Sequence, residues 1–385
     1  MKPIITSIGA SLLLVSLTTA HAPRYTLTDL GPVGPGGLPL YISANGIISG
    51  AAAARDGSDH AVLWYRRFKV DIARPGLGGA NSIAFGVNVF GQAVGAAETG
   101  QPDPSRVDFC GFKTYGLPTA GGVCAPFFWQ NGVMRKLPTL GGNNGTASQI
   151  NRWGVAAGEA ETALSDPDCP ERFQFKPVRW HDGRIHELST LSGDPDAVAY
   201  AINDRGQVVG SSGTCAPFNP ALQLALHPLH PILWQPDGTA ISLGSLGGTG
   251  YGVGNLAINI NNNAHVVGTS DLAGDATAHA FFWRSERGME DLGTLPGDVG
   301  SGAVGINDSD EVVGVSLDAS FNLRAFVWHR GEMTDLNLLV PASRLHLLLA
   351  TSVNDRGDII GLAVDTGTGE LHGYLAAPRA HRSEN

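Results

Sequence analysis

The sequence predicts an all-β protein, a seven-bladed β-propeller with four antiparallel strands in each blade. Three observations predict this fold. A step of eight residues from an apolar residue to a glycine recurs seven times, at intervals of about fifty residues, which indicates a repeat architecture. A tryptophan follows the step in six of the seven modules. The chain also begins with a segment that matches the last strand of a module, and it ends with a module that lacks this strand.

The recurring step predicts a β-hairpin. Each copy is an apolar residue, a turn and a short apolar strand that ends in glycine: Ile42–Gly50, Val87–Gly95, Ile150–Gly158, Ile202–Gly210, Ile260–Gly268, Ile306–Gly314 and Val353–Gly361. Asn, Asp and Gly in the turns supply the positive φ angles of tight hairpins. No segment keeps a helical period of 3.6 residues over two turns, so a helical fold is not expected.

The fourth module shows the expected strand order most clearly. Its strands A to D are Val198–Ile202, Gln207–Ser211, His230–Trp234 and Thr239–Leu243. They are rich in Val, Ile, Leu and aromatic residues, which favour half-buried pleated surfaces.

A tryptophan occupies one place on strand C of six modules. The six are Trp64, Trp129, Trp180, Trp234, Trp283 and Trp328, and the alignment places Leu375 there in the seventh module. A large ring at a fixed place predicts packing between neighbouring sheets, with its N–H bonded locally. Trp153 lies in a turn, outside this pattern.

The two ends of the chain predict how the ring closes. Residues 25–31 match strand D of other modules, such as Met289–Gly293, and the last module, residues 348–377, has only strands A to C. We expect the first strand to complete the last blade, because pairing covers two sheet edges that would otherwise promote aggregation. An open solenoid would instead need capping repeats at both ends.

Residues 1–22 predict a secretory signal peptide, with Lys2 ahead of an apolar stretch that is too short to span a membrane. Cleavage is expected after Ala20 or after Ala22, although Pro23 disfavours the second site. Residues 23–378 would form one propeller domain and residues 379–385 a flexible tail. We therefore expect a monomer that is exported to the periplasm or the extracellular space, without membrane insertion.

Charge and composition limit the kinds of partner and cofactor that the protein is expected to bind. The net charge is −10 and no basic cluster occurs, which argues against nucleic acids as partners. The 12 histidines are scattered singly, unlike a metal cluster. No cofactor is expected, although calcium held by loop aspartates is left open, without an EF-hand loop.

The repeats resemble the HAF-repeat family of exported bacterial proteins, named after a His-Ala-Phe triplet. His279-Ala280-Phe281 carries the triplet complete, followed by Phe282-Trp283 and by Met289–Leu295. His60-Ala61-Val62 and Arg324-Ala325-Phe326 are near matches. The resemblance covers nearly the whole chain after residue 22 and implies export and a repeat fold, but no defined activity. A recurring His at a strand start is expected to be a hydrogen-bonding cap rather than a metal ligand.

The loops between strands B and C vary while the hairpin turns do not. From the strand B glycine to the start of strand C the distances are 10, 30, 18, 20, 11, 10 and 11 residues in modules one to seven. Because insertions collect where binding residues are carried, we expect the function on this face, over blades 2 to 4. All four cysteines lie in these loops. Pairing of Cys110 with Cys124 and of Cys169 with Cys215 is favoured, and the other pairings stay open.

These loops supply the candidate binding residues. They are Asp103, Arg106, Asp108, Phe112, Tyr115, Asp166, Asp168, Arg172, Phe173 and Phe218. Carboxylates beside aromatic rings suit recognition of a glycan or a peptide, so a binding or scaffold module is the predicted function. The alternative is an extracellular enzyme that cleaves a polysaccharide or a peptide with acidic residues on the same face, such as Asp108 with Asp166 or Asp168. No Ser-His-Asp or HExxH arrangement supports it.

Overall fold

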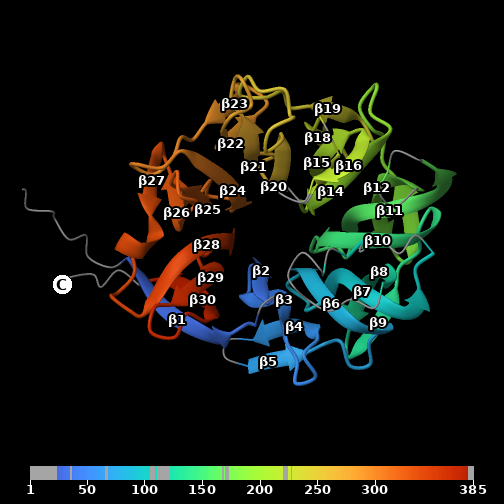
Figure 1. The fold of residues 1–385 in the computed structure, drawn as a ribbon, viewed down its shortest axis with the longest axis horizontal. Helices are drawn as coiled ribbons and strands as arrows, with labels where there is room; N and C mark the ends of the chain where they lie inside the picture. The colour runs from blue at the N-terminus through green and yellow to red at the C-terminus, as the bar shows by residue number, and fades with distance from the viewer. Residues whose placement is uncertain are drawn as a thin grey trace, which may run out of the picture.

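The computed structural model describes residues 24–34, 37–65, 68–104, 109–110, 112, 121–166, 169, 173–219, 224–226 and 228–379. They form a closed ring of seven four-stranded antiparallel sheets, seen down its axis in Figure 1. The predicted seven-bladed propeller is therefore confirmed. The predicted signal peptide and residues 380–385 lie outside the described residues.

The strands follow one another from the channel to the rim in each blade. Blade 1 contains β2 (Leu38–Ile42), β3 (Ile47–Ala53), β4 (Asp59–Tyr65) and β5 (Phe68–Asp71). Blade 2 contains β6 (Gly78–Val87), β7 (Ala93–Pro102), β8 (Gly122–Gln130) and β9 (Val133–Lys136). Blade 3 contains β10 (Gly141–Ile150), β11 (Ala156–Ser165), β12 (Phe173–His181) and β13 (Arg184–Glu187). Blade 4 contains β14 (Asp196–Ile202), β15 (Val208–Gly213), β18 (His230–Trp234) and β19 (Ala240–Ser242). Blade 5 contains β20 (Leu256–Ile260), β21 (Val266–Asp271), β22 (Ala278–Arg284) and β23 (Gly288–Asp291). Blade 6 contains β24 (Gly300–Ile306), β25 (Val312–Leu317), β26 (Leu323–His329) and β27 (Glu332–Asp335). Blade 7 contains β28 (Leu345–Val353), β29 (Ile359–Asp365), β30 (Leu371–Pro378) and, as its outermost strand, β1 (Tyr25–Pro32). In the long loop of blade 4, β16 (Cys215–Asn219) and β17 (Leu224–Leu226) form a small additional sheet.

The first strand closes the ring as predicted. β1 pairs antiparallel with β30, with Leu27 opposite Ala376 and Asp29 opposite Tyr374 (Figure 1). The contact continues past the strand, because the N–H of Arg379 donates to the carbonyl of Arg24 at 2.8 Å. Arg379, the first residue of the predicted tail, is therefore tied to the propeller.

The recurring tryptophans pack between neighbouring blades, as predicted. Trp180 of blade 3 shares a buried cluster with Val94 of blade 2. The ring N–H of Trp180 donates to the carbonyl of Pro138 at 2.8 Å, and that of Trp234 donates to the carbonyl of Ser189 at 2.5 Å. The ring nitrogen of Trp64 is buried without a partner among the described residues, so local bonding does not hold in every blade.

The placement of Leu375 at the tryptophan position was wrong by one residue. In blade 6, Trp328 lies opposite Val312, and the equivalent pair in blade 7 is Ala376 opposite Ile359. Side chains alternate between the two faces of a strand, so a shift of one residue exchanges the faces. Leu375 instead packs against the cluster that contains Trp64.

In blades 1, 5 and 7 the recurring histidine joins strands C and D of the same blade, whereas Nδ1 of His230 in blade 4 lies 2.9 Å from the Asp194 carboxylate ahead of β14. Nδ1 of His60 lies 2.7 Å from the Asp71 carboxylate, and Nδ1 of His279 lies 3.0 Å from that of Asp291. In blade 7, His372 reaches Asp29 on β1 at 2.9 Å and so fastens the closing strand. These histidines are hydrogen-bonding caps, as expected.

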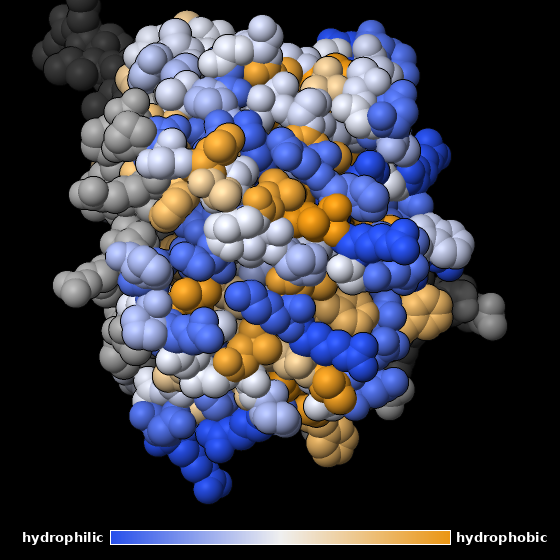
Figure 2. Space-filling model, turned by 90° about the vertical axis from the view of Figure 1, so that its right-hand side faces the viewer, coloured by the Kyte–Doolittle hydropathy of each residue, from blue (hydrophilic) through white to orange (hydrophobic). Residues whose placement is uncertain are grey.

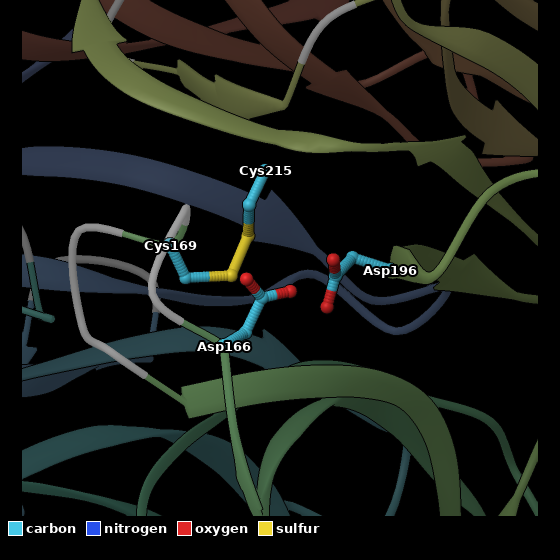
Figure 3. Close-up of side chains that lie close together, drawn as sticks. All are labelled: Asp166, Cys169, Asp196 and Cys215. Carbon is cyan, nitrogen blue, oxygen red and sulfur yellow. A yellow bond between two sulfur atoms is a disulfide. The ribbon is translucent and has the colours of Figure 1, made fainter.

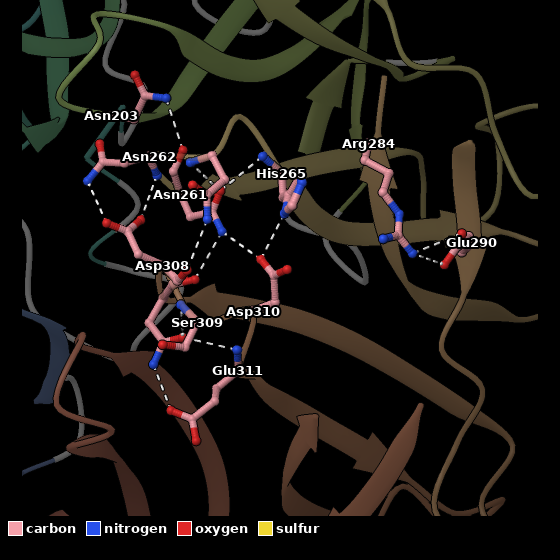
Figure 4. A network of polar contacts seen from close by, with 12 residues as sticks. Asn203, Asn261, Asn262, His265, Arg284, Glu290, Asp308, Ser309, Asp310 and Glu311 are labelled. Atoms are coloured by element: carbon pink, nitrogen blue, oxygen red, sulfur yellow. Dashed lines mark hydrogen bonds and ion pairs between the residues drawn. The ribbon is translucent and has the colours of Figure 1, made fainter. Parts of the chain in front are cut away.

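A ring of asparagines links the blades on the side of the A–B turns. The first turn residue is Asn in six blades: Asn88, Asn151, Asn203, Asn261, Asn307 and Asn354. Asn203 Oδ1 accepts hydrogen bonds from the N–H groups of Arg205 and Gln207, each at 3.0 Å. Its Nδ2 donates to the carbonyl of Asn261 in the next blade at 3.0 Å (Figure 4). The sequence analysis did not predict these contacts between blades.

The same bond repeats around the ring. Asn88, Asn151, Asn261 and Asn307 each donate to the next turn asparagine at 3.0–3.1 Å. Asn354 donates to the carbonyl of Ser43 at 3.2 Å, and in blade 1 Asn45 completes the circle with Val89.

The outer surface over blade 3 and its neighbours has a mixed character. Apolar residues are interspersed among polar ones on the rim in Figure 2 rather than gathered into one broad patch. None of the helices in the described part of the chain is both long and apolar enough to cross a membrane.

Candidate functional site

The central channel is lined by side chains from all seven blades. The innermost strands line it with the residues two positions before the last residue of each strand A: Leu40, Phe85, Ser148, Tyr200, Ile258, Val304 and Thr351. The channel widens there into a cavity of about 370 Å³. Residues from blades 1, 2, 5 and 6 make most of its apolar wall, whereas blades 3 and 4 contribute Thr146, Gln149, Glu159 and Tyr200.

Glu159 is the acidic group of this cavity. It lies on β11, and its carboxylate accepts a hydrogen bond from the hydroxyl of Thr146 on β10. Burial raises the pKa of Glu159 to about 7, and the Thr146 bond only partly offsets this. A carboxyl with such a pKa can donate or accept a proton near neutral pH.

Tyr200 of blade 4 stands beside this carboxyl. Burial raises the pKa of Tyr200 well above its ordinary value, and the charge of Glu159 raises it further. The phenol therefore remains protonated and can act as a hydrogen-bond donor in the cavity. Glu159 and Tyr200 are the polar pair around which a ligand would orient.

The long loop of blade 2 covers one side of the cavity. Phe109 and Cys110 line it, and both pack against the same buried cluster as Phe85 and Leu40 of the innermost strands. The disulfide between Cys110 and Cys124 ties this loop to β8. The loop thus adds an aromatic wall to the side of the ring on which the insertions lie.

Phe112 is a core residue rather than a binding residue. Its side chain is 2% exposed and packs with Ile83, Ala96 and Cys124 under the same loop. The prediction that its ring faces a ligand is therefore corrected. The disulfide draws the loop inward, and the large ring of Phe112 is buried with it.

The opposite mouth of the channel is acidic. Asp204, Asp308 and Asp355 follow the turn asparagines around a smaller cavity of about 110 Å³. Each is held by the ring: Asp204 Oδ1 accepts from the N–H of Arg152 at 2.9 Å, and Asp355 Oδ1 accepts from that of Asp308 at 3.0 Å. Burial raises the pKa of Asp355, and the charges of Asp308 and Asp204 add to this effect.

The other predicted site residues that the structure describes, Asp103, Asp166 and Phe173, do not gather into one exposed patch. Asp103 is 3% exposed and accepts a hydrogen bond from Asn144 in the next blade, so it is a structural residue. Asp166 is half-buried and lies near Asp196. Phe173 is half-buried at the start of β12.

Several candidates fall where the structure gives no side chain. Phe218 lies on β16, where the structure describes its backbone alone. Outside the described residues lie Arg106, Asp108, Tyr115, Asp168 and Arg172.

The two disulfides join the pairs that the sequence analysis favoured. Cys110 bonds to Cys124 within one loop, and Cys169 of blade 3 bonds to Cys215 of blade 4. The second bond crosses from one blade to the next and fixes two of the three long loops to one another.

Sequence reasoning missed Glu159 and Tyr200. Both lie on regular strands, Glu159 on β11 and Tyr200 on β14, whereas site residues were expected in the loops between strands B and C. A signal was present, because a glutamate follows directly after the strand B glycine only in blade 3, where other blades have Ala, Ser, Thr, Val or Leu.

No protein-family model matches the chain, and no curated protein matches it, so membership of the HAF-repeat family stays a prediction. The chain is similar to an oligogalacturonate lyase in complex with manganese, at 11% identity over 94% of this chain and 95% of that chain, with a TM-score of 0.46. It is also similar to the Trypanosoma rangeli sialidase in complex with sialic acid, at 10% identity over 92% and 59%, with a TM-score of 0.40. A mutant Aleuria aurantia lectin in complex with Fucalpha1-6GlcNAc matches at 9% identity over 91% and 96%, with a TM-score of 0.34. Similarity at this level carries no argument about function.

Proposed function

We propose that the protein is an exported binding module of the HAF-repeat type that holds the end of a glycan in the central cavity, on the loop side of blades 2 to 4. The observation that carries this proposal is the combination of aromatic walls with one half-buried carboxyl in the same cavity. Two disulfides support an oxidising compartment outside the cytoplasm.

The chemistry of the cavity suits a sugar ring. The rings of Phe85, Phe109 and Tyr200 offer surfaces on which the apolar face of a sugar can stack. The hydroxyl of Ser148 can bond its hydroxyls, and Glu159, which Thr146 holds in place, can fix its orientation. A volume of about 370 Å³ lies within the range of small-molecule sites, which is about 300–1,000 Å³.

An enzyme that cleaves glycans is the second candidate. The pKa of Glu159, about 7, meets the requirement for a general acid or base. Glycoside hydrolysis generally uses two carboxyl groups, however, and Glu159 is the one carboxyl that lines the cavity among the described residues. Binding without cleavage is therefore the better supported function.

A glycan and peptide array with the purified protein tests the proposal. Glu159→Gln and Tyr200→Phe should each weaken binding to the recognised glycan at least 10-fold, because each removes one polar contact inside a desolvated site. Matched controls on the outside of the ring, Glu332→Gln and Tyr251→Phe, should bind as the wild type does.

Unchanged binding in both cavity variants would refute the site. Selective binding of peptides would replace the glycan as ligand. Release of reducing sugar by the wild type, abolished in Glu159→Gln, would convert the binding module into an enzyme.

A further inference from the structure

Two neighbouring blade junctions contain the same arrangement of residues with one chemical difference. In the first, Asp103 lies eight residues after the strand B glycine of blade 2 and meets Asn144 at the start of blade 3. In the second, Asp166 lies eight residues after the strand B glycine of blade 3 and meets Asp196 at the start of blade 4. Asn144 and Asp196 are equivalent, since each lies six residues before the end of its strand A.

The equivalence extends to the hydrogen bonds. Asn144 Oδ1 accepts from the N–H of Cys124 at 2.8 Å, and Asp196 Oδ1 accepts from that of Phe175 at 3.0 Å. Cys124 and Phe175 each lie five residues before the recurring tryptophan. The junctions differ in the other terminal atom of this side chain, which is Nδ2 in Asn144 and Oδ2 in Asp196.

At the first junction this second atom is a donor. Asn144 Nδ2 donates to Asp103 Oδ2 at 2.7 Å and to Glu161 Oε1 at 2.9 Å. At the second junction it is Asp196 Oδ2, an acceptor that has no hydrogen-bond partner among the described residues although Asp196 is 0% exposed. The position of Glu161 is taken by Gly213, which offers no side chain.

The carboxylates of Asp166 and Asp196 therefore face each other across a buried gap (Figure 3). One carboxylate oxygen of Asp166, one of Asp196 and the sulfurs of Cys169 and Cys215 all lie within 4.8 Å of one another. Those sulfurs form a disulfide, so they are not thiolate ligands. Two carboxylates at this separation match the oxygen ligands of a hard cation, which calcium binds at about 2.3–2.6 Å.

We propose that Asp166 and Asp196 bind a calcium ion that joins the long loop of blade 3 to blade 4 beside the Cys169–Cys215 disulfide. The ion supplies the positive charge that Asn144 Nδ2 supplies as a partial charge at the neighbouring junction. Because Asp166 is half-buried, the ion can enter from solvent. The site lies apart from the cavity around Glu159, so this proposal does not depend on the proposed function.

Thermal unfolding of the purified protein at pH 7.5, in EDTA and in 10 mM calcium, tests this site. With a Kd of about 10⁻⁴ M, typical of the weaker class of calcium sites, the Tm of the wild type should rise by roughly 3–6 °C in calcium. Isothermal titration calorimetry should show one ion per chain.

Asp196→Asn is the decisive variant, because it copies the junction between blades 2 and 3. It should abolish the calcium response and keep a Tm in EDTA at least as high as that of the wild type, since the new amide can donate to Asp166. Asp204→Asn, at the acidic mouth of the channel, should respond to calcium as the wild type does.

Three results would overturn the proposal. The wild type could show no shift in calcium, or Asp196→Asn could respond like the wild type, or Asp204→Asn could lose the response. A Tm that rises on lowering the pH from 7.5 to 5.5, without any calcium response, would assign a shared proton to the pair instead.

Discussion

The two faces of the ring are held together in different ways. On the face of the A–B turns, one asparagine bond is repeated from blade to blade and returns to its start through Ser43 and Asn45. On the face of the B–C loops, lengths vary and two disulfides fix individual loops. Because a repeated contact joins neighbouring blades on one face, the other face is free to diversify and to carry a site.

Removal of the blade-to-blade disulfide should have the largest effect on the variable face. Replacing Cys169 and Cys215 together by Ala should lower the free energy of unfolding by about 4 kcal/mol, because the bond closes a long stretch of the unfolded chain. The bonded residues are 46 apart in sequence. Urea unfolding without reductant measures the change.

The other disulfide is the matched control. Cys110 and Cys124 are 14 residues apart, so their replacement by Ala should cost about 3 kcal/mol. A larger loss from this shorter pair would contradict the entropic explanation.

On the uniform face, Asn203→Ala should lower the free energy of unfolding by about 2–4 kcal/mol, because it removes four side-chain hydrogen bonds at once. Asn203→Ser should cost less, since Ser43 in blade 1 accepts from the N–H of Ile47 at 2.9 Å from the same position. A loss below about 0.5 kcal/mol for Asn203→Ala would show that the asparagine ring does not hold the blades together.

Between the two faces, Glu159 should make stability depend on pH. Its pKa is raised from 4.5 to about 7 on folding, so its stabilising effect is complete below about pH 4.5 and is lost as the pH rises through 7. Between pH 5 and 8 the free energy of unfolding of the wild type should fall by about 1–2 kcal/mol relative to that of Glu159→Gln, after allowance for screening by water in the cavity. Parallel pH curves for the two proteins would show that the carboxyl is not desolvated.

The smallest effect concerns equivalent tryptophans. Trp234→Phe should lower the free energy of unfolding by about 1 kcal/mol more than Trp64→Phe, because Trp234 loses a hydrogen bond to Ser189 whereas the ring nitrogen of Trp64 has no partner in the described part of the chain. Equal losses in urea unfolding would indicate that packing alone decides this position.

The fold could be predicted because its signals are local and repeated. Each hairpin carries its own turn residues, and the first strand carries the pattern of strand D, so β1 was expected on β30. The error at Leu375 has a local cause as well. The seventh module lacks the tryptophan that sets the alignment elsewhere, and a slip of one residue exchanges the faces of the strand.

The site could be predicted only in part. The cysteine pairs and the covering loop of blade 2 followed from loop lengths, but Phe112 turned inward where an exposed ring was expected. Glu159 lies in a strand of alternating small and polar residues, Gly158-Glu159-Ala160-Glu161, in which either glutamate could point to solvent. Only ring closure places Glu159 in the channel.

The sequence by itself determined the number of blades and the order of the strands, because turns and strand periods act between residues that are near in sequence. It also determined how the chain closes, because the first strand carries the strand D pattern that the last module lacks. The tertiary structure alone decided which side chains meet, such as Glu159 with Tyr200 and Asp166 with Asp196. These pairs lie on different blades, and their contact depends on the rotation between neighbouring sheets, which packing of the whole ring sets.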